Sequence, residues 1–162
     1  MHIANITGGA GVTLDILLPD AWSREKKQGG KAVWLLHDVN EASGNWVSCT
    51  QAEVFANAYG VALIAPSMGR LAAYRDSEPG CTWETFFVKG LWDYLHEIVP
   101  ALSEKPEDQL IFGRGAGGEA AKRFAAEYPR QYSQAMACGT DWLECNDVLR
   151  RAIADFAQIQ DK

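Results

Sequence analysis

Short, mostly apolar runs alternate with amphipathic segments along most of the chain. The runs have the composition of strands that are buried on both faces, and they cover residues 32–37, 61–66, 109–113 and 133–139. The segments between and after them repeat apolar residues at helical spacing, and they cover residues 50–60, 83–100, 118–129 and 144–160. Because buried strands that alternate with helices pair in parallel through right-handed crossovers, the pattern predicts a parallel sheet with helices on both faces.

The N-terminal part of the chain has a different pattern. Residues 2–6 and 12–19 form two short runs, and the second alternates apolar and polar residues up to Pro19, which is typical of antiparallel strands near a sheet edge. Residues 22–31 are polar with a Gly-Gly break and predict a loop. We find no internal repeat or long linker. The sequence therefore predicts one α/β domain over residues 1–162, with a mostly parallel sheet of about six strands.

Composition excludes several classes of protein. The chain is 48% hydrophobic and 22% charged with a net charge of -6, as expected of a globular domain, and it has no basic block of the kind that binds nucleic acid. No apolar stretch approaches the roughly 18 residues of a membrane span, and the N-terminus does not resemble a secretory leader. We therefore expect a cytoplasmic protein with neither a membrane nor a nucleic-acid partner.

The cysteines and histidines are scattered. The cysteines at 49, 81, 138 and 145 form no C-x-x-C pair, and His2, His37 and His96 do not cluster. This spacing predicts no metal site, and nothing in the sequence indicates another cofactor. In a cytoplasmic protein the thiols stay reduced, so Cys138, at the end of an apolar run, is predicted to be a buried thiol.

A glycine-rich turn joins the third apolar run to its helix in "IFGRGAGGEA", residues 111–120. In α/β-hydrolases this junction is the nucleophile elbow, G-x-S-x-G, whose central serine attacks the substrate. The glycines of the frame stand at Gly113 and Gly117, but the serine position holds Gly115.

Further stretches, in order, resemble the esterase D-like α/β-hydrolases, the group that includes tributyrin esterases and S-formylglutathione hydrolases. The resemblance covers residues 10–142 and rests on "VWLLHDVNEASGNW", "VALIAPS", "TWETFFVKGLWDYLHEIVP" and "LIFGRGAGGEAAKRFAAEYPRQYSQAMACG". It implies an esterase-type fold in a truncated form, because a full family member continues well beyond this length. It also implies that residues 37–39 correspond to the oxyanion loop and Ala116 to the residue whose N–H completes the oxyanion hole.

The residues at these positions depart from the family. Gly115 has no side chain to attack with. The family usually has His-Gly where this chain has His37-Asp38, followed by Val39, and a carboxylate there would oppose the negative charge of the transition state. His37 matches the structural histidine of the family. We interpret these departures as natural loss of the catalytic serine.

The acid and the base are also missing from their expected places. The triad order in this fold is serine, acid, histidine, and no histidine follows His96, which we expect on a helix surface. Asp141 follows a strand, as the family's acid does, but one strand too early. It is a doubtful acid, and a turn or N-cap role suits it better.

Two other motifs compete for a function. "APSMG", residues 65–69, imitates an elbow around Ser67, but it lacks the first glycine. "GRGAGG" fits G-x-G-x-x-G without the acidic residue that a dinucleotide site requires. A small anion at this helix start remains a hypothesis, bound by Gly115, Ala116 and Gly117 with help from Arg114.

The sequence thus predicts an esterase-like homologue without hydrolytic activity that binds a small molecule or a partner at the remnant cleft. The alternative is an active carboxylesterase that uses an unrecognised nucleophile or residues of a partner chain. The strand 133–139 would leave an unpaired edge, and the closing helix would carry an apolar stripe. We therefore expect a homodimer through the edge strand, the C-terminal helix, or both.

Overall fold

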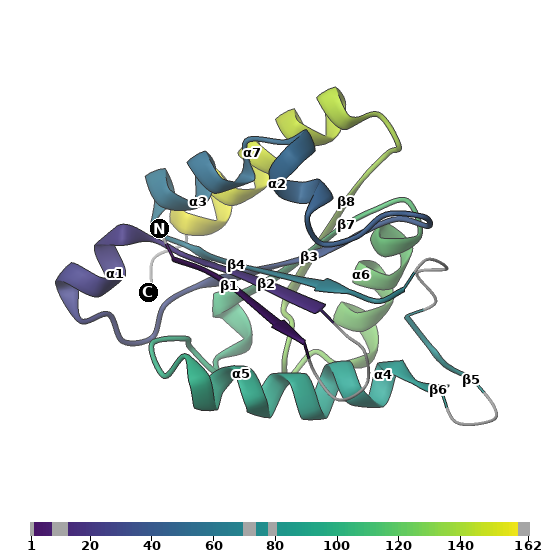
Figure 1. Cartoon of the computed structure of the whole chain (residues 1–162), viewed down its shortest axis with the longest axis horizontal. Helices are drawn as coiled ribbons and strands as arrows, with labels where there is room; N and C mark the ends of the chain where they lie inside the picture. Colours follow the sequence, from purple (N-terminus) through teal and green to yellow (C-terminus); the bar gives the residue numbers. More distant parts are fainter. Residues whose placement is uncertain (1, 8–12, 70–73, 78–80, 159–162) are drawn as a thin grey trace.

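The computed structural model describes residues 2–7, 13–69, 74–77 and 81–158, in which helices cover both faces of a twisted sheet (Figure 1). The strands of this sheet are β1 (His2–Thr7), β2 (Thr13–Leu18), β3 (Ala32–Leu36), β4 (Ala62–Ser67), β7 (Gln109–Arg114) and β8 (Gln134–Cys138). A small hairpin is formed by β5 (Asp76–Ser77) and β6 (Cys81–Thr82). The helices are α1 (Asp20–Glu25), α2 (Asn45–Cys49), α3 (Ala52–Tyr59), α4 (Trp83–Thr85), α5 (Trp92–Ile98), α6 (Ala116–Glu127) and α7 (Trp142–Gln158).

The strand order of the main sheet is β1-β2-β4-β3-β7-β8. The first two strands pair antiparallel, and β2 is also antiparallel to β4, whereas β4, β3, β7 and β8 are parallel to one another. This arrangement confirms the predicted α/β class and the mostly parallel sheet. The carboxyl ends of β3 and β7 therefore lie side by side, which places the loop after β3 next to the glycine turn after β7.

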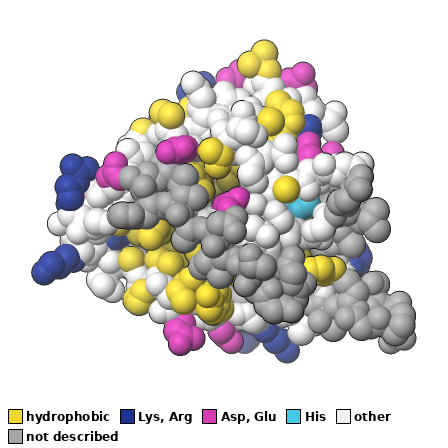
Figure 2. Space-filling view, viewed as in Figure 1, with side chains coloured by type: hydrophobic (Ala, Val, Ile, Leu, Met, Phe, Trp, Pro, Cys, Tyr) yellow, Lys and Arg dark blue, Asp and Glu magenta, His cyan; other side chains and the backbone are white. Residues whose placement is uncertain are grey.

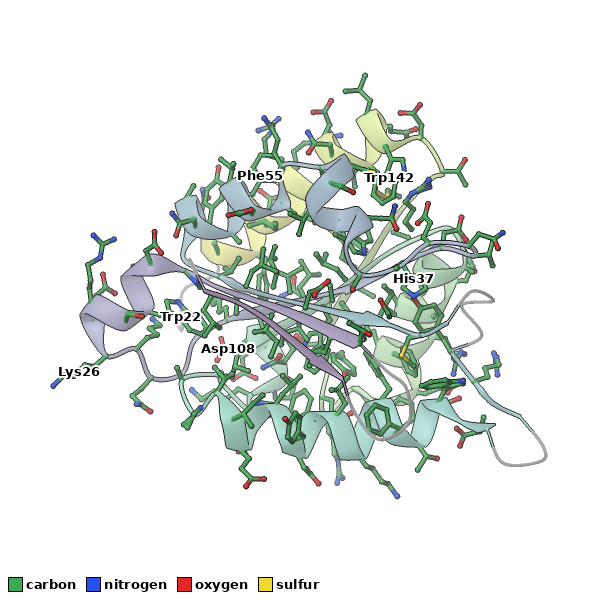
Figure 3. All side chains as sticks on the ribbon, in the orientation of Figure 1. Trp22, Lys26, His37, Phe55, Asp108 and Trp142 are labelled. Carbon is green, nitrogen blue, oxygen red and sulfur yellow. A yellow bond between two sulfur atoms is a disulfide. The ribbon has the colours of Figure 1, made fainter. Side chains whose placement is uncertain are left out.

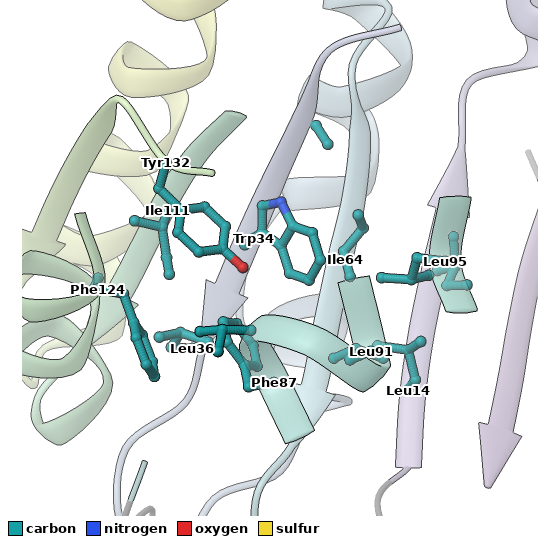
Figure 4. Close-up of a cluster of buried hydrophobic side chains, with 14 of the residues drawn as sticks. Leu14, Trp34, Leu36, Ile64, Phe87, Leu91, Leu95, Ile111, Phe124 and Tyr132 are labelled. Carbon is teal, nitrogen blue, oxygen red and sulfur yellow. The ribbon is translucent and has the colours of Figure 1, made fainter. Parts of the chain in front are cut away.

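Two apolar layers hold the helices against the sheet. On one face, Trp34 and Ile111 of the central strands pack against Phe87 and Leu91, and Phe124 of α6 closes the layer (Figure 4). On the other face, the apolar stripe predicted for α7 packs inside the same chain against β3, β7 and α3, through Cys145, Leu149, Ala152, Ile153 and Phe156. Alternate residues of each buried strand serve the two layers, because successive side chains point to opposite faces.

Two elements differ from the predictions. The segment 83–100 is not one α-helix: a π-helix, Phe86–Leu91, separates α4 from α5, and within it the Val88 carbonyl accepts a hydrogen bond from Gln131 Nε2. A side chain that inserts in this way competes with the helical ladder. The predicted loop 22–31 begins as the end of α1, which Trp22 anchors by burying its ring and donating from Nε1 to the Gly60 carbonyl. Because Trp22 is the one buried residue that the structure gives for α1, the sequence there has no repeated apolar spacing that would predict a helix.

The prediction of Cys138 as a buried thiol is wrong, because Cys138 forms a disulfide with Cys145. The connection between the end of β8 and the start of α7 is short, and it brings the two Cα atoms to 5.1 Å. Cys145 is fully buried and Cys138 is half-buried. Cys49 is an exposed free thiol.

Among the described residues, no helix is long and apolar enough to cross a membrane, and no group of three or more potential ligand residues could hold a metal ion. On the face shown in Figure 2, lysine and arginine side chains are scattered around the rim rather than gathered in a patch. Val12 and the predicted helix end at 159–160 lie outside the described residues.

A glycine at the close approach of β7 and α6 provides a test of the fold. A Cβ added at Gly113 would lie 2.0 Å from the Gly117 carbonyl oxygen, so we expect Gly113→Ala to lower the free energy of unfolding by at least about 2 kcal/mol. Gly44→Ala is the matched control, because a Cβ there meets no atom within 4 Å and φ is -61°. Urea denaturation measures both, and equal stability of the two variants would contradict the tight packing.

Candidate functional site

The glycine turn after β7 has the backbone of a nucleophile elbow. Gly115 joins the strand to α6 with φ 53° and ψ -121°, a conformation that side chains rarely adopt. A Cβ at Gly117 would lie 2.2 Å from the Leu36 carbonyl oxygen, so the glycines of the frame also allow β3, β7 and α6 to approach closely. The elbow is therefore present as a structure although its serine is absent.

A carboxylate lies where the elbow would carry its chemistry. Asp38 Oδ1 accepts hydrogen bonds from the backbone N–H groups of Val39 and Ala116, each at 2.8 Å. A Cβ built on Gly115 would be 2.1 Å from Asp38 Oδ2. The structure thus brings together Asp38, Val39 and Ala116, and the Asp38 carboxylate occupies the space that a side chain at residue 115 would enter. The N-terminus of α6 favours a negative charge at this point.

Glu41 fixes the loop that carries Asp38. Its Oε2 accepts from the Asp38 backbone N–H at 3.1 Å, and its Oε1 forms an ion pair with Arg114 Nη2 at 2.9 Å. The Arg114 side chain is only 7% exposed, and its guanidinium stacks on the Trp142 ring at 4.0 Å from the ring centre. Arg114, a candidate anion ligand from the sequence, is therefore engaged by Glu41 and Trp142.

His37 is part of the scaffold beneath the loop (Figure 3). Its Nε2 accepts from the Met68 backbone N–H at 2.9 Å, so Nδ1 carries the proton and donates to the Asp38 carbonyl at 2.7 Å. Burial lowers the pKa of His37, against smaller opposing effects of that carbonyl and of the Glu41 and Asp38 charges. Both nitrogens are hydrogen-bonded to the backbone, so the ring has no free lone pair with which to act as a general base.

Tyr74 completes this buried polar group. Its hydroxyl donates to the His37 carbonyl oxygen at 2.8 Å. Burial, as the largest cause, raises the pKa of Tyr74 well above its usual value, so the phenol keeps its proton. Tyr74 acts as a hydrogen-bond donor to the backbone here and not as an acid or a base.

The other sequence candidates have structural partners. Asp141 Oδ1 accepts from the Glu144 backbone N–H at 2.9 Å, which is the N-cap interaction of α7. Ser67 Oγ accepts from the Ser43 backbone N–H at 2.8 Å and donates to the Ser43 hydroxyl at 2.9 Å. Neither pattern includes the base that would activate a nucleophile.

Sequence reasoning missed the second part of the site. Glu41 stands three residues after Asp38, a spacing that closes a turn, but nothing in the sequence pairs it with Arg114. The available signal was that Glu41 and Arg114 carry opposite charges in the loops that follow two buried strands. The contact between Trp142 and Arg114 is likewise a tertiary contact without a local sequence signal.

One open groove lies away from the elbow, at the opposite end of α6. Its volume is about 470 Å³, and it is lined by Val88, Lys89, Glu127, Tyr128, Pro129, Arg130 and Gln131. None of the elbow or oxyanion-loop residues contributes to it. Two of its polar lining residues already have partners: Glu127 pairs with Arg123 at 3.3 Å, and the Tyr128 hydroxyl donates to Glu84 at 2.8 Å. We therefore take the elbow as the candidate site.

The strand order, the turn at Gly115 and the loop after β3 together define an α/β-hydrolase fold. No family model and no curated protein matches the sequence. The solved structures that resemble it include a fluorophosphonate-binding serine hydrolase (FphF) of Staphylococcus aureus, with a TM-score of 0.83 and 16% identity over 97% of this chain and 98% of that one.

Two S-formylglutathione hydrolases are also similar in structure. The enzyme from Staphylococcus aureus has a TM-score of 0.79 and 16% identity over 97% of this chain and 96% of its own. The enzyme from Agrobacterium tumefaciens has a TM-score of 0.71 and 15% identity over 96% of this chain and 67% of its own. At such identities the likeness establishes the fold, which confirms the esterase-like α/β-hydrolase architecture expected from the sequence.

Removal of the Asp38 side chain tests whether it fills an anion site. Asp38→Ala frees the N–H groups of Val39 and Ala116, so acetate or phosphate should raise the Tm of this variant. An anion at 100 times its Kd adds about 2.7 kcal/mol of stability. The wild-type protein should gain less at equal ionic strength, and Asp38→Asn should behave like the wild type because its amide oxygen still accepts. Equal anion shifts in Asp38→Ala and wild-type protein would contradict the assignment.

Proposed function

We propose that this protein is a non-hydrolytic homologue of the esterase-like α/β-hydrolases that acts by binding a small molecule or a partner at the remnant active site. One observation carries the proposal: the Asp38 carboxylate accepts the two N–H groups that an oxyanion would need, beside a glycine at the nucleophile position. The names of the neighbours, a serine hydrolase and S-formylglutathione hydrolases, support an ester-cleaving ancestry.

The electrostatics at this point disfavour acyl transfer. The tetrahedral intermediate of ester hydrolysis places a full negative charge on the oxyanion, and a fixed carboxylate in the same space both blocks and repels it. Loss of a single oxyanion donor reduces kcat by about 10² to 10³-fold, and here both donors are already satisfied within the chain. The absent nucleophile acts in the same direction, and so does His37, whose Nε2 lone pair already accepts the Met68 N–H.

We expect no turnover of p-nitrophenyl acetate or butyrate above buffer, and none from Gly115→Ser. A serine at 115 would place its Cβ against Asp38 and would have no histidine to take its proton, and general-base assistance is worth about 10² to 10⁴-fold. The double variant Asp38→Gly with Gly115→Ser makes room for the serine side chain but supplies no histidine to take its proton. We therefore expect no turnover from it either.

Ser67→Ala provides the control for an unrecognised nucleophile. If the wild-type protein cleaved these esters and Ser67→Ala abolished the activity, the alternative of an active carboxylesterase would replace our proposal. Activity that appears in Gly115→Ser alone would show that a base had been overlooked and that Asp38 moves aside.

We further propose that the protein forms a homodimer through the outer edge of β8. Among the described strands, β8 pairs only with β7, and all of its residues are at least partly exposed, with Met136 at 40%. Leu143, just beyond it, is 77% exposed. The strand carries no charge, so an antiparallel pair of β8 strands around a two-fold axis has no like-charge repulsion. The apolar stripe of α7 is used within the chain, so the strand is the available surface.

Light scattering across micromolar concentrations tests this interface. We expect a mass of twice 17.8 kDa for the wild-type chain, and a shift toward the monomer for Met136→Lys, which would bring two positive charges together at the axis. Val54→Lys is the matched control, because Val54 is 61% exposed on α3. A monomer at all concentrations, or equal effects of the two lysines, would remove the proposal.

A further inference from the structure

A continuous series of contacts connects the disulfide to the carboxylate in the oxyanion site. The Cys138–Cys145 bond closes the loop that contains Trp142, and the Trp142 ring packs on Arg114 at 4.0 Å. Arg114 holds Glu41 at 2.9 Å, and Glu41 in turn accepts the backbone N–H of Asp38.

The charged side chains in this series are mostly buried. Arg114 is 7% and Glu41 14% exposed, so their ion pair is shielded from water and sensitive to geometry. Arg114 Nε and Nη1 have no hydrogen-bond partner within the described chain, so Glu41 and the Trp142 ring are the contacts that orient this guanidinium. A buried cation with so few partners is expected to depend strongly on each of them.

The disulfide positions Trp142 from both ends of its loop. Cys138 is the last residue of β8, and Cys145 lies in the second turn of α7, where its side chain is fully buried in the apolar layer beneath the helix. Trp142 begins α7 and also meets Trp46 of α2 edge-to-face, with ring centres 5.5 Å apart. Without the covalent bond, the start of α7 would keep the Asp141 N-cap, the hydrogen bond from the Gln51 N–H to Asn146 Oδ1 and the apolar packing of Cys145 and Leu149, but it would lose its covalent link to the end of β8.

We propose that the Cys138–Cys145 disulfide is a redox-sensitive device that holds Asp38 in the oxyanion site through Trp142, Arg114 and Glu41. The inference rests on the proposed function, since it concerns the regulation of the same site. In the oxidised protein the carboxylate blocks the two N–H donors. In the reduced protein the loop loosens, Arg114 releases Glu41, and the donors at Val39 and Ala116 become accessible to a small anionic ligand.

The redox step needs an external dithiol reductant. A thiolate of the dithiol attacks Sγ of Cys138, the more exposed of the two sulfurs, and Cys145 leaves as a thiolate. The second thiol of the reductant then displaces Cys138 and forms the reductant's own disulfide. Two electrons and two protons pass to the protein, which ends with two thiols. The Cys145 thiolate then takes up a proton, because its apolar surroundings favour the neutral thiol.

Amide hydrogen exchange at Ala116, followed by NMR on the full chain with and without dithiothreitol, tests the device. We use a Cys49→Ser background, because Cys49 is an exposed thiol that could exchange with the disulfide. Denatured oxidised protein should show two fewer titratable thiols than reduced protein. Reduction should speed exchange of the Ala116 N–H by about tenfold or more, while the Leu35 N–H in the centre of the sheet stays protected.

Matched variants separate the relay from general loosening. Oxidised Trp142→Ala should exchange at Ala116 like the reduced protein although its disulfide is intact, whereas Trp142→Phe keeps a ring beneath Arg114 and should stay near wild type. Cys138→Ser combined with Cys145→Ser should exchange quickly and ignore dithiothreitol.

Three results would overturn the inference: equal thiol counts before and after reduction, an Ala116 exchange rate that reduction leaves unchanged, or an equal rise at Leu35, which would mean that the whole fold loosens. None of these three results bears on ester hydrolysis. Turnover of an ester would contradict the proposed function at any exchange rate. The two proposals can therefore fail independently.

Discussion

The two hydrogen bonds from the Val39 and Ala116 backbones to Asp38 Oδ1 are the interaction on which the site depends. In an α/β-hydrolase, two backbone N–H groups stabilise the negative charge that forms during the reaction. Here a side chain of the same chain supplies that charge permanently. The helix dipole of α6 and the two N–H groups stabilise the carboxylate, and the carboxylate satisfies donors that would otherwise require solvent.

This arrangement also explains why glycine stands at the centre of the elbow. With Asp38 in place, a Cβ at residue 115 would meet the carboxylate, and the positive φ already disfavours side chains. A side chain at residue 115 and the carboxylate of Asp38 would therefore occupy the same space, so glycine at 115 is required while Asp38 keeps this position. The tight turn at Gly115 allows β3, β7 and α6 to pack closely, and this packing does not depend on catalytic residues in the turn.

Much of the architecture could be predicted from the sequence, because buried parallel strands and amphipathic helices leave clear periodicities. The runs that became β3, β4, β7 and β8 were identified within a residue or two. The short helix α1 and the π-helix could not be predicted, since one depends on a single buried Trp22 and the other on Gln131 reaching across to Val88. The disulfide was missed because the thiols were expected to stay reduced. The spacing of Cys138 and Cys145 also gives no signal by itself, because the short β8–α7 connection is what brings the two residues together.

For the site, the sequence pointed to Asp38, Arg114 and Gly115, but it did not show how these residues meet. Asp38 was expected to oppose an oxyanion, yet its position inside the donor pair follows only from the adjacency of β3 and β7. The partnership of Glu41 with Arg114 is a tertiary contact with no local signal.

The central claim, that Asp38 occupies the oxyanion site, can be measured directly by NMR scalar coupling across hydrogen bonds. We predict couplings from the amide nitrogens of both Val39 and Ala116 to the side-chain carboxyl carbon of Asp38. Absence of both couplings, with the two amide signals unchanged in Asp38→Ala, would place the carboxylate elsewhere and contradict the account.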